Sequence, residues 1–141
     1  MSDRHRQLTK IAEQFSLDII YAFGSHAKEA LAFLRGEIKE IPFPPRSDLD
    51  IGVKPSKRAK LDVHQKVELA ITLEDLFSAP RVDLIVIPEV DPFIAANVIR
   101  GERIYVKDEN LADEYDLYIL RRAGDIAPIE RERIALIFGE K

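Results

Sequence analysis

Hydrophobic and polar positions along the chain switch repeatedly between a period of two and a period near 3.6. Short runs of apolar, β-branched residues predict buried strands, and apolar residues at every third or fourth position predict amphipathic helices. The predicted helices cover residues 3–15, 25–35, 61–77, 92–100 and 111–122, and the predicted strands cover residues 17–23, 49–53, 82–87 and 103–106. The residues expected on the inner face of the longest helix are Val63, Val67, Ala70, Ile71 and Leu73 or Glu74.

This order of elements predicts an α/β (α+β) fold, in which helices flank a small mixed β-sheet. The sequence has no internal repeat or low-complexity stretch, so we expect a single domain over residues 1–141. An insertion at about residues 36–47 contains three closely spaced prolines, which favour an extended arm. A tail from about residue 124 is interrupted by Gly124 and Pro128 and is apolar near its end. We expect it either to pack on the core or to bind a partner.

The turn after the first predicted strand contains Gly24 and Ser25. Glycine has no Cβ and lets a ligand approach the backbone, and Ser25 suits a helix start whose free N–H groups favour a phosphate. The same two residues also occur in ordinary strand–helix turns, so alone they do not identify a phosphate site. His26, in the same turn, is expected to be solvent-exposed, with a phosphate contact as the alternative.

Two carboxylates open the second predicted strand. Asp48 and Asp50 are two positions apart, so their side chains project from one face of the strand, with Leu49 and Ile51 on the other. Neighbouring carboxylates repel and raise each other's pKa, and Mg²⁺, which prefers oxygen ligands, relieves that repulsion. The alternative is a solvated strand entrance with two surface acids.

A third carboxylate, Asp83, lies near the start of the strand predicted over residues 82–87. If this strand lies beside the one that carries Asp48 and Asp50, three acids converge, and a pair of metal ions can bridge nucleotide phosphates and the attacking oxygen. The alternative is an ordinary carboxylate at a strand end, paired with Arg81.

Composition and charge narrow the classes of function. A net charge of −4 argues against a general nucleic-acid binder, and the absence of cysteine excludes disulfides and thiolate metal sites. No apolar run is long enough to span a bilayer, so we expect a cytoplasmic protein without a membrane partner. The basic cluster formed by Lys54, Lys57, Arg58 and Lys60 is either a solvated helix start or a phosphate-facing patch.

Taken in order, the motifs resemble the DNA-polymerase-β-like nucleotidyltransferases. The similarity is greatest to the small, single-domain MNT class, the minimal nucleotidyltransferases, which includes MntA-type antitoxins. It extends from about residue 17 to about residue 107. The matching residues are Gly24, Ser25, Ala27 and Lys28; Ser47, Asp48, Leu49, Asp50 and Ile51; and Val82, Asp83 and Leu84. The chain departs from the pattern in two ways: the insertion roughly doubles the usual spacing between the first two motifs, and Lys28 replaces a more common arginine.

The resemblance implies a polymerase-β-like nucleotidyltransferase fold and the transfer of AMP from ATP to a hydroxyl group. It implies that Mg²⁺ is bound by Asp48, Asp50 and Asp83, and that Asp83 also helps to deprotonate the acceptor. The nucleotide-binding residues that it implies are Gly24, Ser25, Lys28 and Ser47.

The resemblance also implies a partner. Small MNT proteins are commonly antitoxins that inactivate a HEPN-domain ribonuclease toxin by AMP transfer to a tyrosine. The chain is not itself such a toxin, because no histidine follows Arg121 and Arg122 in the HEPN spacing. Two alternatives are a catalytically silent antitoxin that binds its partner and a small-molecule nucleotidyltransferase. The insertion either shapes the acceptor site or is a neutral surface segment, and assembly with itself or with a partner is left open.

Overall fold

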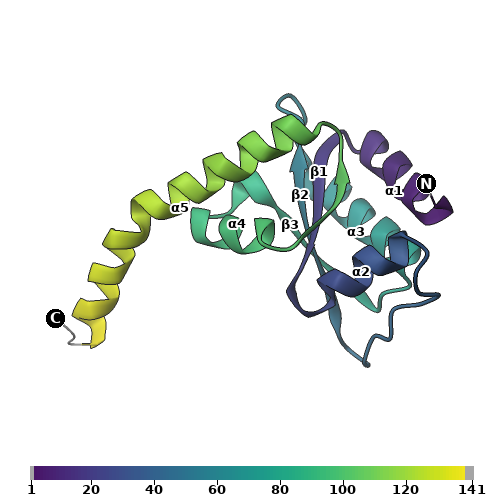
Figure 1. The fold of residues 1–141 in the computed structure, drawn as a ribbon, viewed down its shortest axis with the longest axis horizontal. Helices are drawn as coiled ribbons and strands as arrows, with labels where there is room; N and C mark the ends of the chain where they lie inside the picture. The colour runs from purple at the N-terminus through teal and green to yellow at the C-terminus, as the bar shows by residue number, and fades with distance from the viewer. Residues whose placement is uncertain (1, 139–141) are drawn as a thin grey trace.

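A four-stranded mixed sheet, with strand order β3-β2-β1-β4, forms the centre of the computed structural model (Figure 1). Strand β1 is antiparallel to both β2 and β4, and β2 is parallel to β3. The structure describes residues 2–138, with side chains as far as Asp125. Its elements are α1 (Asp3–Gln14), β1 (Leu17–Phe23), η1 (Gly24–His26), α2 (Ala27–Leu34), β2 (Asp48–Pro55), α3 (Val63–Phe77), β3 (Arg81–Val86), η2 (Ile87–Glu89), α4 (Pro92–Ile99), β4 (Glu102–Val106) and α5 (Glu109–Phe138).

Each face of the sheet is covered by its own helices. Ile20 and Ala22 of β1 belong to the core formed with α1, α2 and α3, whereas Ile19, Tyr21 and Phe23 belong to a second core formed with α4 and α5. This is the period of two expected of a strand buried on both faces. Figure 1 shows the two groups of helices on opposite sides of the strands. The predicted fold class, a helix-flanked mixed sheet, is confirmed.

The starts of two helices are set by local chemistry. The helix expected from Ser25 opens with the 3-10 turn η1 before it becomes regular in α2. Helix α3 begins slightly later than predicted because Asp62 caps it: the Asp62 side chain accepts a hydrogen bond from the Gln65 N–H, and the Gln65 side chain accepts one from the Asp62 N–H.

The buried face of α3 agrees with the prediction only at Leu73, which is fully buried, and at Ala70, which packs against the core. Its buried residues are Leu69, Leu73 and Phe77. By contrast, Val63, Val67 and Ile71 are 76%, 54% and 52% exposed. The helix carries two apolar stripes, and the stripe with the larger side chains packs on the core because it buries more apolar area. Periodicity alone does not distinguish two such stripes.

Helix α5 continues where the sequence predicts an end. Gly124 and Pro128 were expected to interrupt it, yet the backbone is helical from Glu109 to Phe138. Proline at position 128 has no N–H to bond the carbonyl of Gly124, which favours a bend, and Figure 1 shows α5 bending in its second half. The second half of α5 extends away from the sheet, so its backbone does not pack on the core. The side chains after Asp125 lie outside the described residues.

The insertion is fastened to the first helix. Arg4 Nη1 donates hydrogen bonds to the carbonyl oxygens of Phe33 and Ile38 at 2.8 and 2.6 Å. Its Nη2 donates to the carbonyl oxygen of Lys39 at 2.8 Å, and its guanidinium lies 3.9 Å from the centre of the Phe33 ring. Ile41 is buried in the core on the α1–α3 side. The insertion is therefore an ordered part of the domain, although most of its residues are exposed.

Of the helices within residues 2–138, none combines the length and the apolar character needed to cross a membrane.

Candidate active site

The carboxylates singled out in the sequence lie on two neighbouring strands. In the parallel pair of β2 and β3, Asp50 is in register with Asp83. Leu49 and Ile51 are fully buried on the α1–α3 side, so Asp48 and Asp50 project from the other face, as the spacing predicts. Strands β2 and β3 are adjacent, as the convergence of the three acids requires.

Charge is unbalanced around Asp50. Partial burial raises the pKa of its carboxyl group, and the negative charges of Asp83 and Asp48 raise it further, whereas His26 acts in the opposite direction. Asp48 also lies 3.9 Å from Arg81 Nε, in an exposed ion pair. Among the described residues, no three acidic, histidine or cysteine side chains are grouped so that they hold a metal ion as they stand. Asp50 and Asp83 thus form the centre of the acidic site, and Asp48 lies at its edge, where it contacts Arg81.

Gly24 packs directly against the acidic pair. Phe23 is the register partner of Asp50 in the antiparallel pair of β1 and β2, which brings the next residue to this carboxylate. The φ angle of Gly24 is +74°, a conformation that glycine adopts at little cost. A Cβ at this position would collide with Oδ2 of Asp50. Glycine is therefore required here both for its backbone conformation and for the close approach.

Two further polar side chains lie near the acids. Ser47 Oγ is buried and has no hydrogen-bond partner within the described part of the chain. A buried hydroxyl left without a partner is unfavourable, so this group calls for a water or a ligand. The predicted exposure of His26 is wrong: its side chain is only 12% exposed, its Nδ1 lies 2.9 Å from Glu29 Oε1, and its ring meets that of Phe43 at 5.0 Å. Phe43 belongs to the insertion, which therefore reaches the site.

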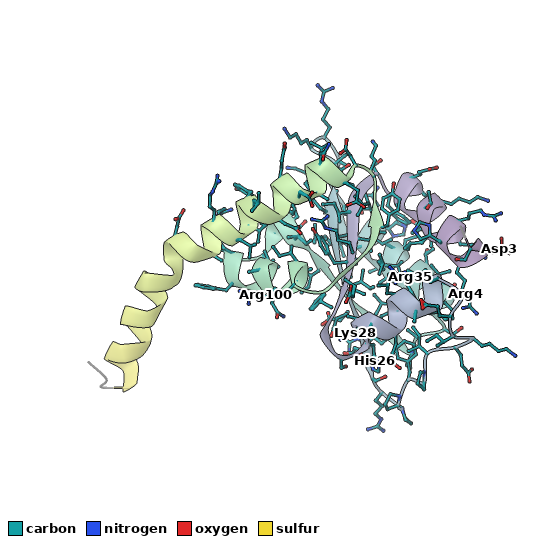
Figure 2. The ribbon with its side chains drawn as sticks, in the orientation of Figure 1. Asp3, Arg4, His26, Lys28, Arg35 and Arg100 are labelled. Atoms are coloured by element: carbon teal, nitrogen blue, oxygen red, sulfur yellow. The ribbon has the colours of Figure 1, made fainter. Side chains whose placement is uncertain are left out.

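A cavity of about 380 Å³ lies on the other side of the glycine turn. Gly24, Ser25 and Lys28 line it, so three of the four predicted nucleotide-binding residues come together there, whereas Ser47 is not among its lining residues. Asn97 and Arg100 of the α4 end complete the wall and were not predicted. The signal that points to them is their spacing of three within an otherwise apolar helical segment. Figure 2 shows Lys28 on α2 and Arg100 at the end of α4.

The basic cluster at the end of β2 does not line this cavity. Lys54 Nζ lies 3.1 Å from Asp18 Oδ2 and 5.2 Å from the centre of the Tyr115 ring. These residues line a larger cavity of about 870 Å³ at the end of β1 opposite Gly24. The charge on Lys54 is thus already balanced within the fold, and the alternative of a patch that faces the nucleotide phosphates near Gly24 is not supported.

The sequence profile described as polymerase beta, nucleotidyltransferase matches residues 6–110. The chain belongs to the polymerase beta nucleotidyltransferase family. The matched part contains the glycine turn and all three acids of this nucleotidyltransferase. Comparison of the sequence with curated proteins found no match.

Solved structures of toxin–antitoxin complexes share the fold of this nucleotidyltransferase. A chain of a toxin–antitoxin complex with AMP-PNP is 21% identical, with a TM-score of 0.64 and 96% of both chains covered. A chain of a mutant MntA–HpeT toxin–antitoxin complex is 20% identical, with a TM-score of 0.65 and 96% of both chains covered. A chain of the complex between the tri-AMPylated Shewanella oneidensis HEPN toxin and an MNT antitoxin is 19% identical, with a TM-score of 0.62; the match covers 96% of this chain and 94% of that one. The fold is therefore the one that the resemblance implies.

Proposed function

We propose that this nucleotidyltransferase transfers AMP from ATP to a protein hydroxyl group, namely a tyrosine of a HEPN-type toxin, and so acts as an antitoxin. The observation that carries the proposal is the register of Asp50 with Asp83, with Gly24 packed against the Asp50 carboxylate. Similar folds in a complex with AMP-PNP and in a complex with an AMPylated HEPN toxin support the choice of nucleotide and partner.

The acidic site fits Mg²⁺ in its chemistry. Burial and the neighbouring carboxylates raise the pKa of Asp50, and a divalent cation would lower it again. The buried Ser47 hydroxyl is free to bond a ligand. Asp50 and Asp83 would hold the cation, joined by Asp48. When bound, Mg²⁺ would neutralise charge on the phosphate oxygens during transfer.

The side chains of the protein then position the two reactants. The hydroxyl oxygen of the acceptor attacks the α-phosphorus, the bond from that phosphorus to the β-phosphate oxygen breaks, and pyrophosphate leaves. Asp83, which is more exposed than Asp50, accepts the proton of the hydroxyl group. Gly24 and Ser25 hold the β- and γ-phosphates at the turn. The rate enhancement comes from orientation and charge neutralisation rather than from a covalent intermediate.

Label transfer from ATP tests the proposal. The full chain is incubated with Mg²⁺, ATP labelled at the α-phosphate, and the protein encoded by the adjacent gene as candidate partner. The double variant Asp48→Asn/Asp50→Asn is the test protein. The matched control is Asp75→Asn, a change of the same kind at an exposed carboxylate on α3. We expect wild type and control to label the partner, and the double variant to lose the labelling.

Three outcomes would separate the alternatives. Neutralisation of the partner that survives in the double variant, with no label transfer by the wild type, would establish a silent binding protein instead. Label that appears on a small hydroxylated acceptor and not on the partner would establish a small-molecule nucleotidyltransferase. Labelling that needs Asp48 and Asp50 but disappears when the partner tyrosines are changed to phenylalanine would identify the acceptor as tyrosine.

A further inference from the structure

The cavity of about 870 Å³ at the end of β1 opposite Gly24 has no part in the proposed transfer. We call it the α5 cavity, because Leu111, Tyr115 and Tyr118 of that helix form one of its walls. Its residue Ile19 and the glycine turn are roughly 15 Å apart along the strand direction, so the α5 cavity is separate from the acidic site. Cavities that bind small molecules commonly have volumes of about 300–1,000 Å³. The volume of the α5 cavity therefore suits a small molecule.

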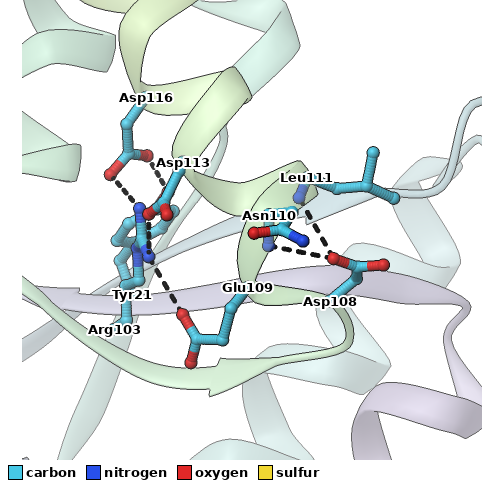
Figure 3. Close-up of polar contacts among 8 residues, drawn as sticks. All are labelled: Tyr21, Arg103, Asp108, Glu109, Asn110, Leu111, Asp113 and Asp116. Carbon is cyan, nitrogen blue, oxygen red and sulfur yellow. Dashed lines mark hydrogen bonds and ion pairs between the residues drawn. The ribbon is translucent and has the colours of Figure 1, made fainter.

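The start of α5 is fixed over the strand ends by hydrogen bonds to the backbone. The Lys107 N–H donates to the carbonyl oxygen of Asp18 at 2.9 Å, which ties the residue after β4 to β1. Asp108 then caps α5, because its Oδ1 accepts hydrogen bonds from the N–H groups of Asn110 and Leu111 at 2.9 and 3.2 Å (Figure 3). The α5 cavity thus lies between elements that hold their positions without a ligand.

The helix wall of the cavity is aromatic. The ring centres of Tyr115 and Tyr118 lie 6.2 Å apart, with 32° between the ring planes. Tyr118 is 52% exposed, so an aromatic surface is open to a ligand. Such a surface binds a planar ring through stacking and burial of apolar area.

The wall also carries an unused hydrogen-bond donor. Burial raises the pKa of Tyr115 to about 12, so its hydroxyl group stays protonated at neutral pH. This hydroxyl group forms no hydrogen bond with any residue whose side chain the structure describes. It is therefore available to donate to a ligand.

Two lysines of the α5 cavity lack a partner. Lys54 is balanced by Asp18, at 3.1 Å. By contrast, Lys57 and Lys107 are exposed and form no hydrogen bond or ion pair through their side chains among the described residues. Of the two remaining carboxylates in the lining, one caps α5, so two unpaired lysines stand against the single carboxylate of Glu114. The charge of the cavity therefore favours an anion.

We propose that the α5 cavity binds a small aromatic anion, whose ring lies against Tyr115 and Tyr118 and whose carboxylate, sulfonate or phosphate group is bound by Lys57 and Lys107. The two tyrosine rings select a planar body, and the lysines select negative charge. An aliphatic anion lacks the first contact, and a neutral aromatic compound lacks the second. The site does not depend on AMP transfer, because none of its residues belongs to the acidic site or to the glycine turn.

Fluorescence titration with the aromatic sulfonate 8-anilinonaphthalene-1-sulfonate (ANS) tests the site. The full chain is used, in buffer without Mg²⁺ or nucleotide, and we expect saturable binding to a single site. The double variant Lys57→Ala/Lys107→Ala should weaken ANS binding by about 10-fold, the usual effect of losing a charge-assisted contact. Tyr118→Ala should also weaken it, because the stacking surface is lost.

Two controls separate the site from non-specific binding. Lys60→Ala changes an exposed lysine of the same basic cluster that does not line the cavity, and it should leave the ANS affinity unchanged. The neutral compound N-phenyl-1-naphthylamine has the same rings without the sulfonate, so it should bind more weakly and should not respond to loss of the lysines. A cooperative thermal transition verifies that each variant is folded.

An unchanged ANS affinity in the folded lysine double variant would overturn the proposal. An equal loss in Lys60→Ala would also overturn it, since it would reflect general attraction of anions, as would equally tight binding of the neutral compound. Displacement of ANS by the protein encoded by the adjacent gene would assign the cavity to a protein contact and refute the small ligand. Binding of ANS that depends on Lys57 and Lys107 in a protein that transfers no AMP would support the site and refute only the proposed function.

Discussion

Two clusters of carboxylates on the α4–α5 side of the sheet differ in how their charge is balanced. In the first, Arg103 Nη1 lies 3.2 Å from Glu109 Oε2 and 2.8 Å from Asp113 Oδ1, and Nη2 lies 2.7 Å from Asp116 Oδ2 (Figure 3). The hydroxyl group of the fully buried Tyr21 donates a hydrogen bond to Asp116. In the second, Asp50 and Asp83 are register partners beside Asp48, and the only ion pair that the acids form within the described residues is the exposed one to Arg81.

The difference separates a structural cluster from a binding site. Around Arg103 the carboxylates are paired with its guanidinium group. Burial together with Asp116 raises the pKa of Tyr21, so its hydroxyl group stays protonated and donates a hydrogen bond. This cluster fastens α5 to β1 and β4. At Asp50 burial and like charges raise the carboxyl pKa more than His26 lowers it, which is the pattern of a site that receives a cation or a substrate. Unbalanced charge, rather than the number of charges, distinguishes the candidate active site.

The largest effect should come from Asp50→Asn. We expect label transfer to fall by about a hundred- to a thousandfold or more, because the central carboxylate of the acidic site is lost. The melting temperature in metal-free buffer should nevertheless rise at neutral pH. A folded-state pKa above the unfolded value means that the ionised carboxylate destabilises the native state, so its removal stabilises it.

Thermal unfolding of Asp50→Asn over a range of pH checks the sign of this effect. The advantage of the variant should be complete above the raised folded pKa and should vanish as the pH falls below the ordinary carboxyl value of about 4, where both states are protonated. A variant that is less stable than wild type at neutral pH would show that Asp50 is structurally compensated, like the carboxylates around Arg103.

Arg103→Met should give the largest loss of stability. Removal of the guanidinium leaves Asp116 and Asp113 without their cation, and we expect the free energy of unfolding to fall by roughly 2–4 kcal/mol in urea titration. The control is Arg122→Met, an exposed arginine on α5, which should change the free energy of unfolding by less than about 0.5 kcal/mol. Similar small changes in both variants would remove the structural role assigned to the Arg103 cluster.

Arg4→Ala tests whether the insertion is held in place. Loss of its hydrogen bonds to three backbone carbonyls should cost about 1–3 kcal/mol and leave the insertion open to proteolysis. Lys10→Ala, at an exposed position of the same helix, is the control. Limited proteolysis followed by mass spectrometry locates the cut. Equal resistance of both variants would show that the buried Ile41 holds the segment without Arg4.

The smallest effect is expected at a paired but exposed charge. Lys66 Nζ lies 2.5 Å from Glu89 Oε1, and the two side chains are 33% and 49% exposed. Solvent screening limits such pairs, so Lys66→Ala should change the free energy of unfolding by less than about 1 kcal/mol. A loss in urea titration as large as that of Arg103→Met would show that burial is not what distinguishes the two ion pairs.

The sequence by itself determined the local features of this protein. The alternation of side chains along residues 48–53 puts Asp48 and Asp50 on one face of the strand. The strand that ends at Phe23 leads into a glycine turn. Both features depend only on residues that are close together in the chain. The same local signals, in order, identified the nucleotidyltransferase family that the sequence profile confirms.

Tertiary structure decided which elements meet. It set the register of Asp50 with Asp83, the burial of His26 under the insertion, and the approach of Arg100 to the glycine turn. It also determined which of the two apolar stripes of α3 is buried, and α5 continues beyond Gly124. Periodicity assigns side chains to a face, whereas register and helix rotation follow from the packing of the whole sheet, because they depend on contacts between residues far apart in the chain.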